Sequence, residues 1–388
     1  MCICGKYNNL DKQFKYILSI KSSIILAATN DVVTDQRVLR TAKTLVEEGY
    51  DVTVICRKLP DRPPLSDITF TVKRKNIWIK NGLGFYASFN ILLFFDLLFS
   101  KVDIITANDL DTLPACSLAA IIRHKYLIYD SHELFIEVPE LNNRKTTKTI
   151  WSFFEKIFIR KAGAVSTVCD SIAKELTEKY TKKCIVIRNV PYYSKFNSIE
   201  KQHDKNNKIM LYQGALNMGR GIEKMIGTML FLNDAKLIIA GTGYLEKALK
   251  QMVTELELTN KVEFVGLLSP TALLALTQQA DIGLSLEENI CKNYNYALPN
   301  KLFDYIQSRV PVICSNLPEM KKIIDRYKVG ISVDVKESYE LALIIKNIFE
   351  HDQLLKIWKN NCNIAASDLC WEKERSKLIE MYKTLKTQ

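Results

Sequence analysis

Acidic residues and one histidine follow two apolar stretches in the first half of the chain. The segment ANDLDTLPA holds Asp109 and Asp111, a D-x-D pair whose spacing can hold a divalent metal beside a diphosphate. Asp111 can also cap a helix that starts at Thr112, and we favour this interpretation over a metal site. The segment DSHELFIEVPEL holds His132, whose imidazole can hydrogen-bond a substrate hydroxyl or phosphate. A purely structural histidine is the alternative.

An earlier segment, TNDVVTDQRVLR, has the features of a helix N-terminus that follows a strand. Thr34 or Asp35 can cap the helix through a side-chain oxygen. The free N–H groups at such a helix start can hold an anion, and Arg37 in the first turn can face the same ligand. A plain helix cap with a surface arginine is the alternative.

Two glycine turns in the second half are candidates for phosphate binding. The first, GALNMGRG, begins at Gly214 and contains Arg220, and the second, AGTG, contains Gly241 and Gly243. Glycines allow a ligand to approach the backbone closely, and the planar fork of arginine suits a phosphate. A single G-x-G turn is common wherever a strand meets a helix, so the pair of turns with an arginine is the stronger signal.

The stretch LPNKLFDY is the most informative in the second half. A helix that starts near Asn300 offers free N–H groups, Lys301 adds a cation, and Asp304 adds a carboxylate. Backbone donors with a lysine suit a diphosphate, and a carboxylate suits the two hydroxyls of a ribose. As a bare pattern, the stretch also fits an ordinary capped amphipathic helix.

Short apolar stretches that we expect to be strands precede these residues. They are 24–28, 52–55, 102–105 and 126–129, then 209–212, 236–240, 262–265, 282–286 and 310–314. Apolar strands that alternate with helical patterns indicate parallel sheets buried on both faces. Ligands of such sheets bind at the carboxyl ends of the strands. The sequence therefore predicts an α/β protein with two doubly wound, Rossmann-like domains that face a cleft.

The domain boundaries follow from where these patterns begin and stop. We expect an N-terminal extension over 1–22, a first domain over 23–193 and a polar linker over 194–208. A second domain covers 209–370, and an amphipathic helix over 371–388 is long enough to pack back across the junction.

Composition describes a globular chain with a positive first half. Of the 388 residues, 47% are hydrophobic and 25% are charged, a mixture typical of a well-filled core. The formal net charge is +11, and residues 1–195 carry +9 of it, with 29 basic and 20 acidic residues. An anionic partner such as a lipid surface, a phosphorylated substrate or nucleic acid would fit this charge. Nucleic acid is disfavoured because no recognition motif is present.

The cysteines and the start of the chain bear on its location. The ten cysteines are scattered, and lysines interrupt any apolar core near the start of the chain, so we read no secretory signal. We therefore expect free thiols and a cytoplasmic location.

Residues 76–101 are strongly apolar, and the core of this segment, 85–99, is too short to span a bilayer. It can form an interfacial helix, with the nearby basic residues of 73–75 on anionic headgroups. A buried helix of the first domain is the alternative, and it is slightly preferred.

Taken together, these motifs resemble those of the retaining GT-B-fold glycosyltransferases of family 4, the glycosyl transferases group 1. The resemblance covers roughly residues 24–385. It rests on TNDVVTDQRVLRTAKTLVEEGYDVTVI, ANDLDTLPA, YDSHE, GALNMGRG, IAGTGYLEKAL, VEFVGLLS and LPNKLFDYIQSRVPVI, in the order of the family. It implies a nucleotide-sugar donor held by the second domain and a glycan or glycolipid acceptor held by the first. It also implies transfer with retention, no metal and no cofactor.

The resemblance also assigns roles to single residues. Arg220 would grip the donor diphosphate, Asp304 the ribose, and His132 would lie near the transferred sugar, and these three form the predicted catalytic set. The other donor-side positions are Gly214, Gly241, Gly243, Asn300 and Lys301. The acceptor-side positions are Asp35, Arg37, Asn108, Asp109 and Glu133.

Two departures from the family pattern keep other functions open. Ala215 replaces an arginine, and Tyr296 replaces the first of two paired glutamates. We expect a hexosyltransferase of surface polysaccharide assembly that works at the inner face of the cell membrane. The alternatives are a GT-B-fold nucleotide-sugar epimerase or hydrolase, and a non-catalytic partner subunit.

Overall fold

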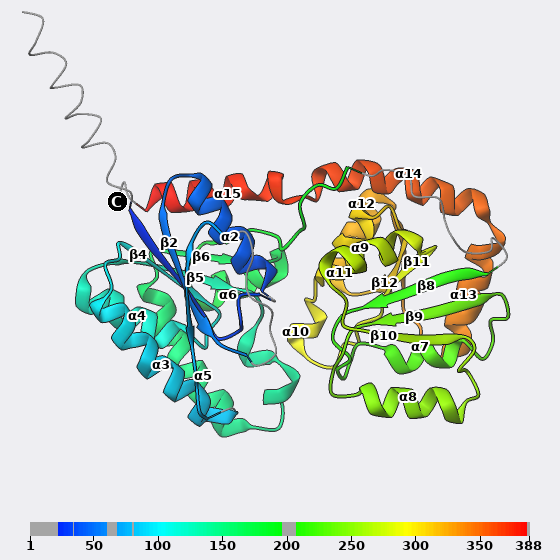
Figure 1. Cartoon of the computed structure of the whole chain (residues 1–388), viewed down its shortest axis with the longest axis horizontal. Coiled ribbons are helices and arrows are strands. Elements are labelled where there is room, and N and C mark those ends of the chain that lie inside the picture. Colours follow the sequence, from blue (N-terminus) through cyan, green and yellow to red (C-terminus); the bar gives the residue numbers. More distant parts are fainter. Residues whose placement is uncertain (1–21, 34, 60–67, 80, 196–206, 386–388) are drawn as a thin grey trace, which may run out of the picture.

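The computed structural model describes residues 22–33, 35–59, 68–79, 81–195 and 207–385. The chain forms two lobes that lie side by side, with the last two helices running across one edge of both (Figure 1). The expected extension over 1–22, except its last residue, and most of the linker over 194–208 lie outside the described residues.

The first lobe is built on a seven-stranded sheet in which every neighbouring pair of strands is parallel, in the order β3-β2-β1-β4-β5-β6-β7. Its strands are β1 (Ser23–Ala28), β2 (Asp51–Arg57), β3 (Thr71–Lys75), β4 (Ile104–Asn108), β5 (Tyr126–Ser131), β6 (Ala164–Thr167) and β7 (Cys184–Val186). The four strands predicted here are confirmed. The sequence patterns missed β3, β6 and β7, because β3 is a charged edge strand and the other two are very short.

The helices of the first lobe connect these strands and cover both faces of the sheet. They are α2 (Gln36–Glu47), α3 (Gly82–Phe99), α4 (Leu113–Arg123), α5 (Lys145–Phe158) and α6 (Asp170–Tyr180), with short 3₁₀ turns at Phe135–Glu137, Pro139–Leu141 and Ile159–Lys161. Figure 1 shows α3, α4 and α5 together on one side of the lobe.

The second lobe repeats the plan with six parallel strands in the order β10-β9-β8-β11-β12-β13. They are β8 (Lys208–Gln213), β9 (Ala235–Ala240), β10 (Val262–Gly266), β11 (Ile282–Ser285), β12 (Val312–Ser315) and β13 (Gly330–Val333). The helices are α7 (Ile222–Thr228), α8 (Glu246–Glu255), α9 (Pro270–Gln279), α10 (Lys292–Asn295), α11 (Asn300–Gln307), α12 (Pro318–Tyr327), α13 (Ser338–Glu350) and α14 (Asp352–Asp368). All five predicted strands of this lobe are present, and β13 is an additional edge strand.

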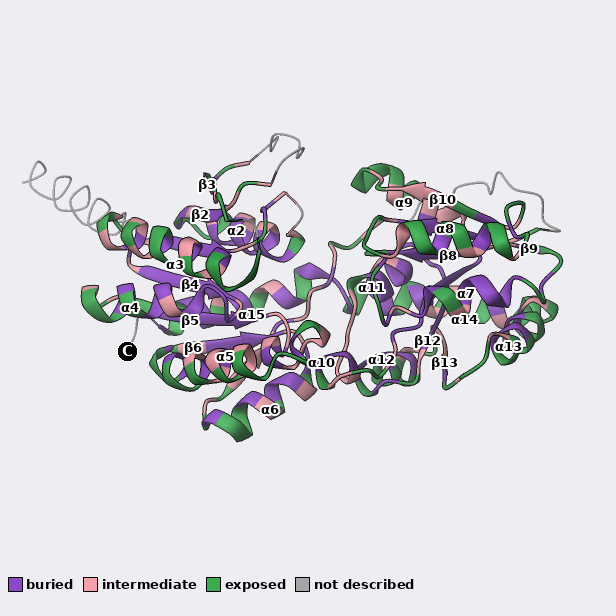
Figure 2. Cartoon of the chain, turned by 90° about the horizontal axis from the view of Figure 1, so that it is seen from below, coloured by how far each residue is buried: buried purple, intermediate pink, exposed green. Residues whose placement is uncertain are grey.

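The strands are buried because helices cover both faces of each sheet (Figure 2). In β4 all five residues are buried, and β1 is buried from its second residue to its last. These are the continuous apolar strands expected of a doubly wound sheet. Such a core fixes the backbone, and this places the residues that follow each strand with little freedom.

The last helix, α15 (Trp371–Thr384), returns to the first lobe as predicted (Figure 1). The fully buried indole of Trp371 donates a hydrogen bond from Nε1 to the hydroxyl of Thr44 on α2, at 2.9 Å. Near its other end, the Tyr382 hydroxyl hydrogen-bonds the hydroxyl of Thr106 on β4, at 2.7 Å. The two lobes are therefore joined by the chain twice.

Helix α3 has features of both alternatives considered for 76–101, the buried helix on its inner side and the interfacial helix on its outer side. Its inner side is buried at Phe85, Phe89, Leu93 and Leu97. Its outer side exposes large apolar side chains, among them Ile91, Phe95 and Phe99. Among the helices of the described residues, α3 is the one whose length and apolar composition would allow it to cross a membrane.

Candidate active site

Residues that follow strands of the first sheet meet the start of α11 of the second lobe at a cavity of about 330 Å³, which we call the reaction cavity. The first lobe contributes Asn30, Asp35, Gln36, Asp109, His132, Glu133 and Asn189 to its lining, and the second lobe contributes Asn300. Residues that are far apart in the sequence thus share one site.

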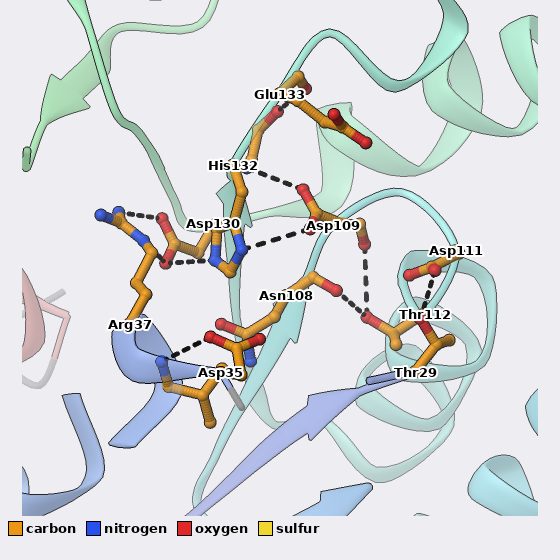
Figure 3. Close-up of polar contacts among 12 residues, drawn as sticks. Thr29, Asp35, Arg37, Asn108, Asp109, Asp111, Thr112, Asp130, His132 and Glu133 are labelled. Carbon is orange, nitrogen blue, oxygen red and sulfur yellow. Dashed lines mark hydrogen bonds and ion pairs between the residues drawn. The ribbon is translucent and has the colours of Figure 1, made fainter. Parts of the chain in front are cut away.

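The imidazole of His132 is held between two carboxylates (Figure 3). Its Nδ1 lies 3.2 Å from Asp109 and its Nε2 lies 3.2 Å from Asp130. The backbone N–H of His132 also donates to Asp109, at 2.7 Å. Burial alone lowers the pKa of His132, but the two carboxylates outweigh it and raise the pKa to about 9. At neutral pH the ring is therefore a fixed cation at the edge of the reaction cavity.

Arg37 holds the second of these carboxylates in place. Its guanidinium donates two hydrogen bonds to Asp130, from Nε at 2.8 Å and from Nη2 at 2.6 Å, and a third from Nη1 to the carbonyl of Ile187. Burial raises the pKa of Asp130, but Arg37 and His132 outweigh it and keep that pKa well below its usual range. Arg37 itself is buried and does not line the reaction cavity, so its place here is behind His132.

Asp130 belongs to this cluster although the predicted site did not include it. Its position gives the signal that could have found it, since it is the penultimate residue of β5 and lies beside the end of β4, where the pair Asn108–Asp130 is in register. A buried acid at a parallel strand end must have a partner, and here the partner comes from α2.

The other first-lobe residues of the predicted site are in the same region (Figure 3). Asp35 caps α2, as predicted, by accepting from the N–H of Val38 at 3.1 Å, and it also lines the reaction cavity. Asn108 is buried and donates to the carbonyl of Ala27, so it ties β4 to β1. Asp109 has a positive φ of 63°, which turns the chain sharply after β4.

The predicted capping role of Asp111 is wrong. Helix α4 begins after Thr112, and the side chain of Asp111 instead accepts a hydrogen bond of 2.5 Å from the hydroxyl of Thr29. Its other carboxylate oxygen is buried without a partner. Burial and the neighbouring Asp109 raise the pKa of Asp111 to about 8, so the group is neutral over most of the physiological range.

Glu133 connects the two lobes through an amide. Asn293, on α10 of the second lobe, donates from Nδ2 to the carboxylate of Glu133 at 3.2 Å, and its Oδ1 accepts from the N–H of Leu134 at 2.9 Å. Burial and the negative charge of Asp109 raise the pKa of Glu133 to about 7. Its carboxyl group therefore changes charge near neutral pH while it faces the cavity.

The glycine turns of the second lobe pack against each other at the ends of β8 and β9. Gly241 has a φ of +143°, and a Cβ there would lie 1.9 Å from the carbonyl oxygen of Gly214. A Cβ on Gly243 would meet the backbone of Leu216 at 2.5 Å. Any side chain at these two positions would push the turns apart. Gly214 also lies beside the Lys301 side chain, so the turns border the cations of the predicted donor site.

Glu287 gathers the two cations of the predicted donor site. Its carboxylate is fully buried, accepts a hydrogen bond from Nζ of Lys301 at 2.7 Å and lies 3.7 Å from the guanidinium of Arg220. Burial raises the pKa of Glu287, but Lys301 and Arg220 outweigh it and lower that pKa. Lys301 is nearly buried, over the ring of Tyr212, whereas Arg220 remains partly exposed over the ring of Tyr294.

Sequence reasoning missed Glu287, although it stands in the second position after β11 and so at a strand end like the other site residues. Its charge is opposite to that expected around a diphosphate, and this is why the motif of cations did not point to it. The structure brings Glu287, Lys301 and Arg220 together from the loop after β11, from α11 and from the loop before α7.

Asp304 lies one turn into α11, where its carboxylate accepts from Nε2 of Gln213 at 3.0 Å. Burial raises the pKa of Asp304 to about 6, against the opposing effects of Arg40 and of that hydrogen bond. Asn300 is exposed at the start of the same helix and reaches the reaction cavity.

The two departures from the family motif also have clear positions. The carbonyl of Ala215 accepts from the Tyr212 hydroxyl at 2.8 Å, so this loop is fixed without the missing arginine. Tyr296 packs against the core of the first lobe, and its carbonyl accepts a weak hydrogen bond from the thiol of Cys169. In this chain, position 296 therefore contributes to the contact between the lobes.

Among the described residues, no group of three or more His, Cys, Asp or Glu side chains is arranged to hold a metal ion.

Two family models match the chain, one in each lobe. Residues 35–190 match the model described as Glycosyltransferase Family 4, and residues 194–363 match the model described as Glycosyl transferases group 1. The chain belongs to this family of GT-B glycosyltransferases. Its two parallel sheets and returning C-terminal helix are the architecture of that fold.

Similar proteins agree with this assignment. Over 208 residues the chain is 26% identical to an uncharacterized glycosyltransferase of Methanocaldococcus jannaschii, a match that spans 50% of either chain. The sucrose-phosphate synthase structure from Thermosynechococcus elongatus has a TM-score of 0.76 at 15% identity and covers 95% of this chain and 100% of its own. The HepE structure from Anabaena, in complex with UDP and glucose, has a TM-score of 0.72 at 16% identity, with 95% and 100% covered.

Proposed function

We propose that this glycosyltransferase takes a sugar from a nucleotide-sugar donor, held mainly by the second lobe, and transfers it with retention to a glycan or lipid-linked acceptor. The observation that carries the proposal is that two cations, Lys301 and Arg220, surround the carboxylate of Glu287. These cations lie beside the glycine turns and face the lobe that holds His132. Two cations against one carboxylate leave a net positive site, and a diphosphate would complete its charge. The solved complex of HepE with UDP and glucose supports a donor of this class.

The residues have distinct tasks in this reaction. The diphosphate would lie against the glycine turns and the start of α11, where free N–H groups, Lys301 and Arg220 offset the charge that develops as the nucleotide leaves. Asp304 would accept hydrogen bonds from the ribose. The cation of His132, oriented by Asp109 and Asp130, would hydrogen-bond the transferred sugar. Asp35, Arg37 and Asn108 would shape the acceptor side without contacting the reacting atoms.

The acceptor hydroxyl would attack the anomeric carbon on the face that the nucleotide leaves. A new C–O bond forms as the bond to the diphosphate breaks, and the leaving phosphate oxygen takes the proton of the hydroxyl. The protein would then act by holding the acceptor hydroxyl and the leaving phosphate on the same face of the sugar and by neutralising phosphate charge. No metal or cofactor has a role in this scheme.

The outer side of α3 supports the proposal that the enzyme binds to a lipid surface. Exposed Ile91, Phe95 and Phe99 form an apolar strip on a lobe that carries most of the net positive charge. An apolar strip beside basic residues suits a membrane with anionic lipids. We propose a peripheral enzyme at the inner face of the cell membrane, in surface polysaccharide assembly.

Product analysis tests the proposal. Purified protein is incubated with UDP-, GDP-, ADP- and CMP-linked sugars and a membrane extract, and the anomeric configuration of the product linkage is read by NMR. Transfer with the configuration of the donor, unchanged in EDTA, is the expected result. An inverted linkage would contradict retention, and loss of activity in EDTA would contradict metal independence.

A nucleotide-sugar hydrolase is the second candidate, and the position of Glu133 favours it. A carboxyl group with a pKa near 7 beside the reaction cavity can take a proton from water. Release of free sugar at the same rate with and without acceptor, and its loss in Glu133→Gln, would support hydrolysis over transfer.

A further inference from the structure

A second cavity adjoins the reaction cavity, and we propose that it binds the acceptor as a sugar linked through phosphate to a lipid. This inference rests on the proposed function. The cavity has a volume of about 470 Å³, and we call it the acceptor cavity. The side chains of its lining that matter here are Leu83, Tyr86, Glu133, Phe135, Arg144 and Arg220.

The acceptor cavity reaches the place where the reaction would occur. Glu133 lines both cavities, so the two spaces share a wall. On the other side the acceptor cavity ends at Arg220, one of the two cations of the donor site. A molecule that fills it would therefore present one end between the donor phosphates and His132.

Aromatic rings form the apolar wall of the acceptor cavity. The ring of Trp151 is almost fully buried and meets those of Tyr86 and Phe135 edge to face, with centroids 5.2 Å and 5.1 Å away. Trp151 thereby fixes the other two rings, which are only half-buried and face the cavity. Ring faces pack well against the C–H surface of a sugar, and the carboxylate of Glu133 can accept from its hydroxyls.

The wall of the cavity continues into an apolar outer surface. Leu83 and Tyr86 lie in the first turns of α3, and the same helix then exposes Ile91, Phe95 and Phe99. Helix α4 packs beside α3 and exposes Leu118, Ile121 and Ile122, and α5 packs beside α4 and exposes Phe153 and Ile157. Figure 2 shows exposed residues along the outer sides of α4 and α5. Exposed apolar side chains on three adjacent helices suit a lipid boundary, so an acyl chain that leaves the cavity along α3 would enter lipid.

The lining of the acceptor cavity also contains a cation, Arg144, which can bind the phosphate between sugar and lipid. Arg144 precedes α5 at the cavity, is exposed, and makes no ion pair with any residue in the described ranges. The next residue, Lys145, is exposed as well. A guanidinium without a carboxylate partner binds phosphate strongly, often through two parallel hydrogen bonds. Arg144 therefore gives the acceptor cavity a phosphate-binding group, beside the aromatic wall for the sugar and the start of α3 for the lipid.

Binding of short-chain probes tests this assignment. Decyl phosphate esters of glucose, galactose, mannose and N-acetylglucosamine are titrated by calorimetry below their micellar concentration, beside the phosphate-free decyl glycosides. We expect one phosphate ester to bind about tenfold more tightly than its glycoside. Arg144→Gln should remove that difference, and Tyr86→Ala should weaken both ligands. Arg160→Gln, which changes an exposed arginine beyond the far end of α5, is the matched control and should change neither.

Binding of UDP, GDP, ADP and CMP is titrated in parallel, so that the acceptor and donor sites are judged separately. A probe that binds when none of the nucleotides binds would support the acceptor cavity and count against the donor site. Binding of a nucleotide with no binding of any phosphate ester, equal affinity for ester and glycoside, or an unchanged preference in Arg144→Gln would overturn the inference. Melting curves of Tyr86→Ala and Arg144→Gln show whether each variant is folded.

Discussion

The charged clusters on the two sides of the cleft differ in balance, although both lie near the carboxyl ends of parallel strands. In the first lobe, the cations Arg37 and His132 alternate with the carboxylates Asp130 and Asp109, and every one of these charges has a partner. In the second lobe, Lys301 and Arg220 share the single carboxylate of Glu287. The cluster of the first lobe is thus electrically neutral, whereas the cluster of the second lobe has a net charge of one positive unit.

This difference suggests that the neutral cluster of the first lobe positions His132, whereas the positive cluster of the second lobe binds an anionic ligand. A balanced, buried network holds His132 in one orientation before any substrate arrives, and such preorganisation is what a developing charge requires. An unbalanced pair of cations gains a partner only when an anion binds. Stability should therefore depend most on the buried charges of either cluster, and donor binding should depend most on the exposed cation, Arg220.

The largest expected effect separates the two cations of the second lobe. Lys301→Met leaves the fully buried Glu287 without its nearest cation and should lower the free energy of unfolding by about 3–5 kcal/mol. Arg220→Met removes a partly exposed group 3.7 Å from the same carboxylate and should cost about 1 kcal/mol or less. Urea unfolding of both variants measures this. Equal losses would contradict the division between a structural and a ligand-binding cation.

A matched test applies to the first lobe. Asp130→Asn removes the charge that Arg37 and His132 share in the interior, and we expect a loss of about 3 kcal/mol in urea unfolding. The control is Asp325→Asn, because Asp325 forms an exposed ion pair with Lys321 at 3.8 Å. Such pairs contribute about 0–1 kcal/mol. A similar loss in both variants would show that the cluster is not special.

The pH dependence of stability should reveal the charge on His132. The folded pKa is about 9, above the ordinary value of 6.5, so the stabilisation is complete below pH 6.5 and is lost as the pH rises through about 9. The shift corresponds to about 3 kcal/mol. Unfolding free energies at pH 6 and pH 9.5 measure it in wild type and in His132→Gln. The variant should lack most of this fall, and an identical fall in both would contradict a buried imidazolium.

Much of this fold could be predicted from sequence because buried parallel strands are continuous apolar runs. All nine strands expected from such runs are present, and the missed ones are edge strands or very short, where charge or length hides the pattern. Site residues directly after strands could be found for the same reason. Partners could not be found, since Arg37 meets Asp130 and Lys301 meets Glu287 only through folding. The role of Asp111 was misjudged because Thr29, 82 positions away, provides its hydrogen bond.

A smaller effect should appear in the pH dependence of donor binding. Asp304 has a pKa of about 6, raised by burial, so its carboxylate becomes protonated as the pH falls below that value. A protonated carboxyl group accepts fewer hydrogen bonds from a ribose. Affinity for the preferred nucleotide should therefore fall about threefold to tenfold between pH 7.5 and pH 5, by calorimetry. In Asp304→Asn the affinity should be low and nearly flat over that range, and a slope equal to that of wild type would assign it to another group.

The central claim is that the second lobe holds a nucleotide-sugar through Arg220 and its neighbours. Nucleotide binding is the most direct test of this claim. Melting temperatures are measured with UDP, GDP, ADP, CMP and their common sugars for wild type, Arg220→Ala and Asp304→Ala. A ligand that binds the folded state must raise the melting temperature, by the equivalent of about 2.7 kcal/mol at 100 times its Kd. We predict a rise with one nucleotide family, largely lost in both variants, because one charge-assisted contact contributes about 1.5–3 kcal/mol. No rise with any nucleotide in folded wild-type protein would contradict the account and favour a non-catalytic partner subunit.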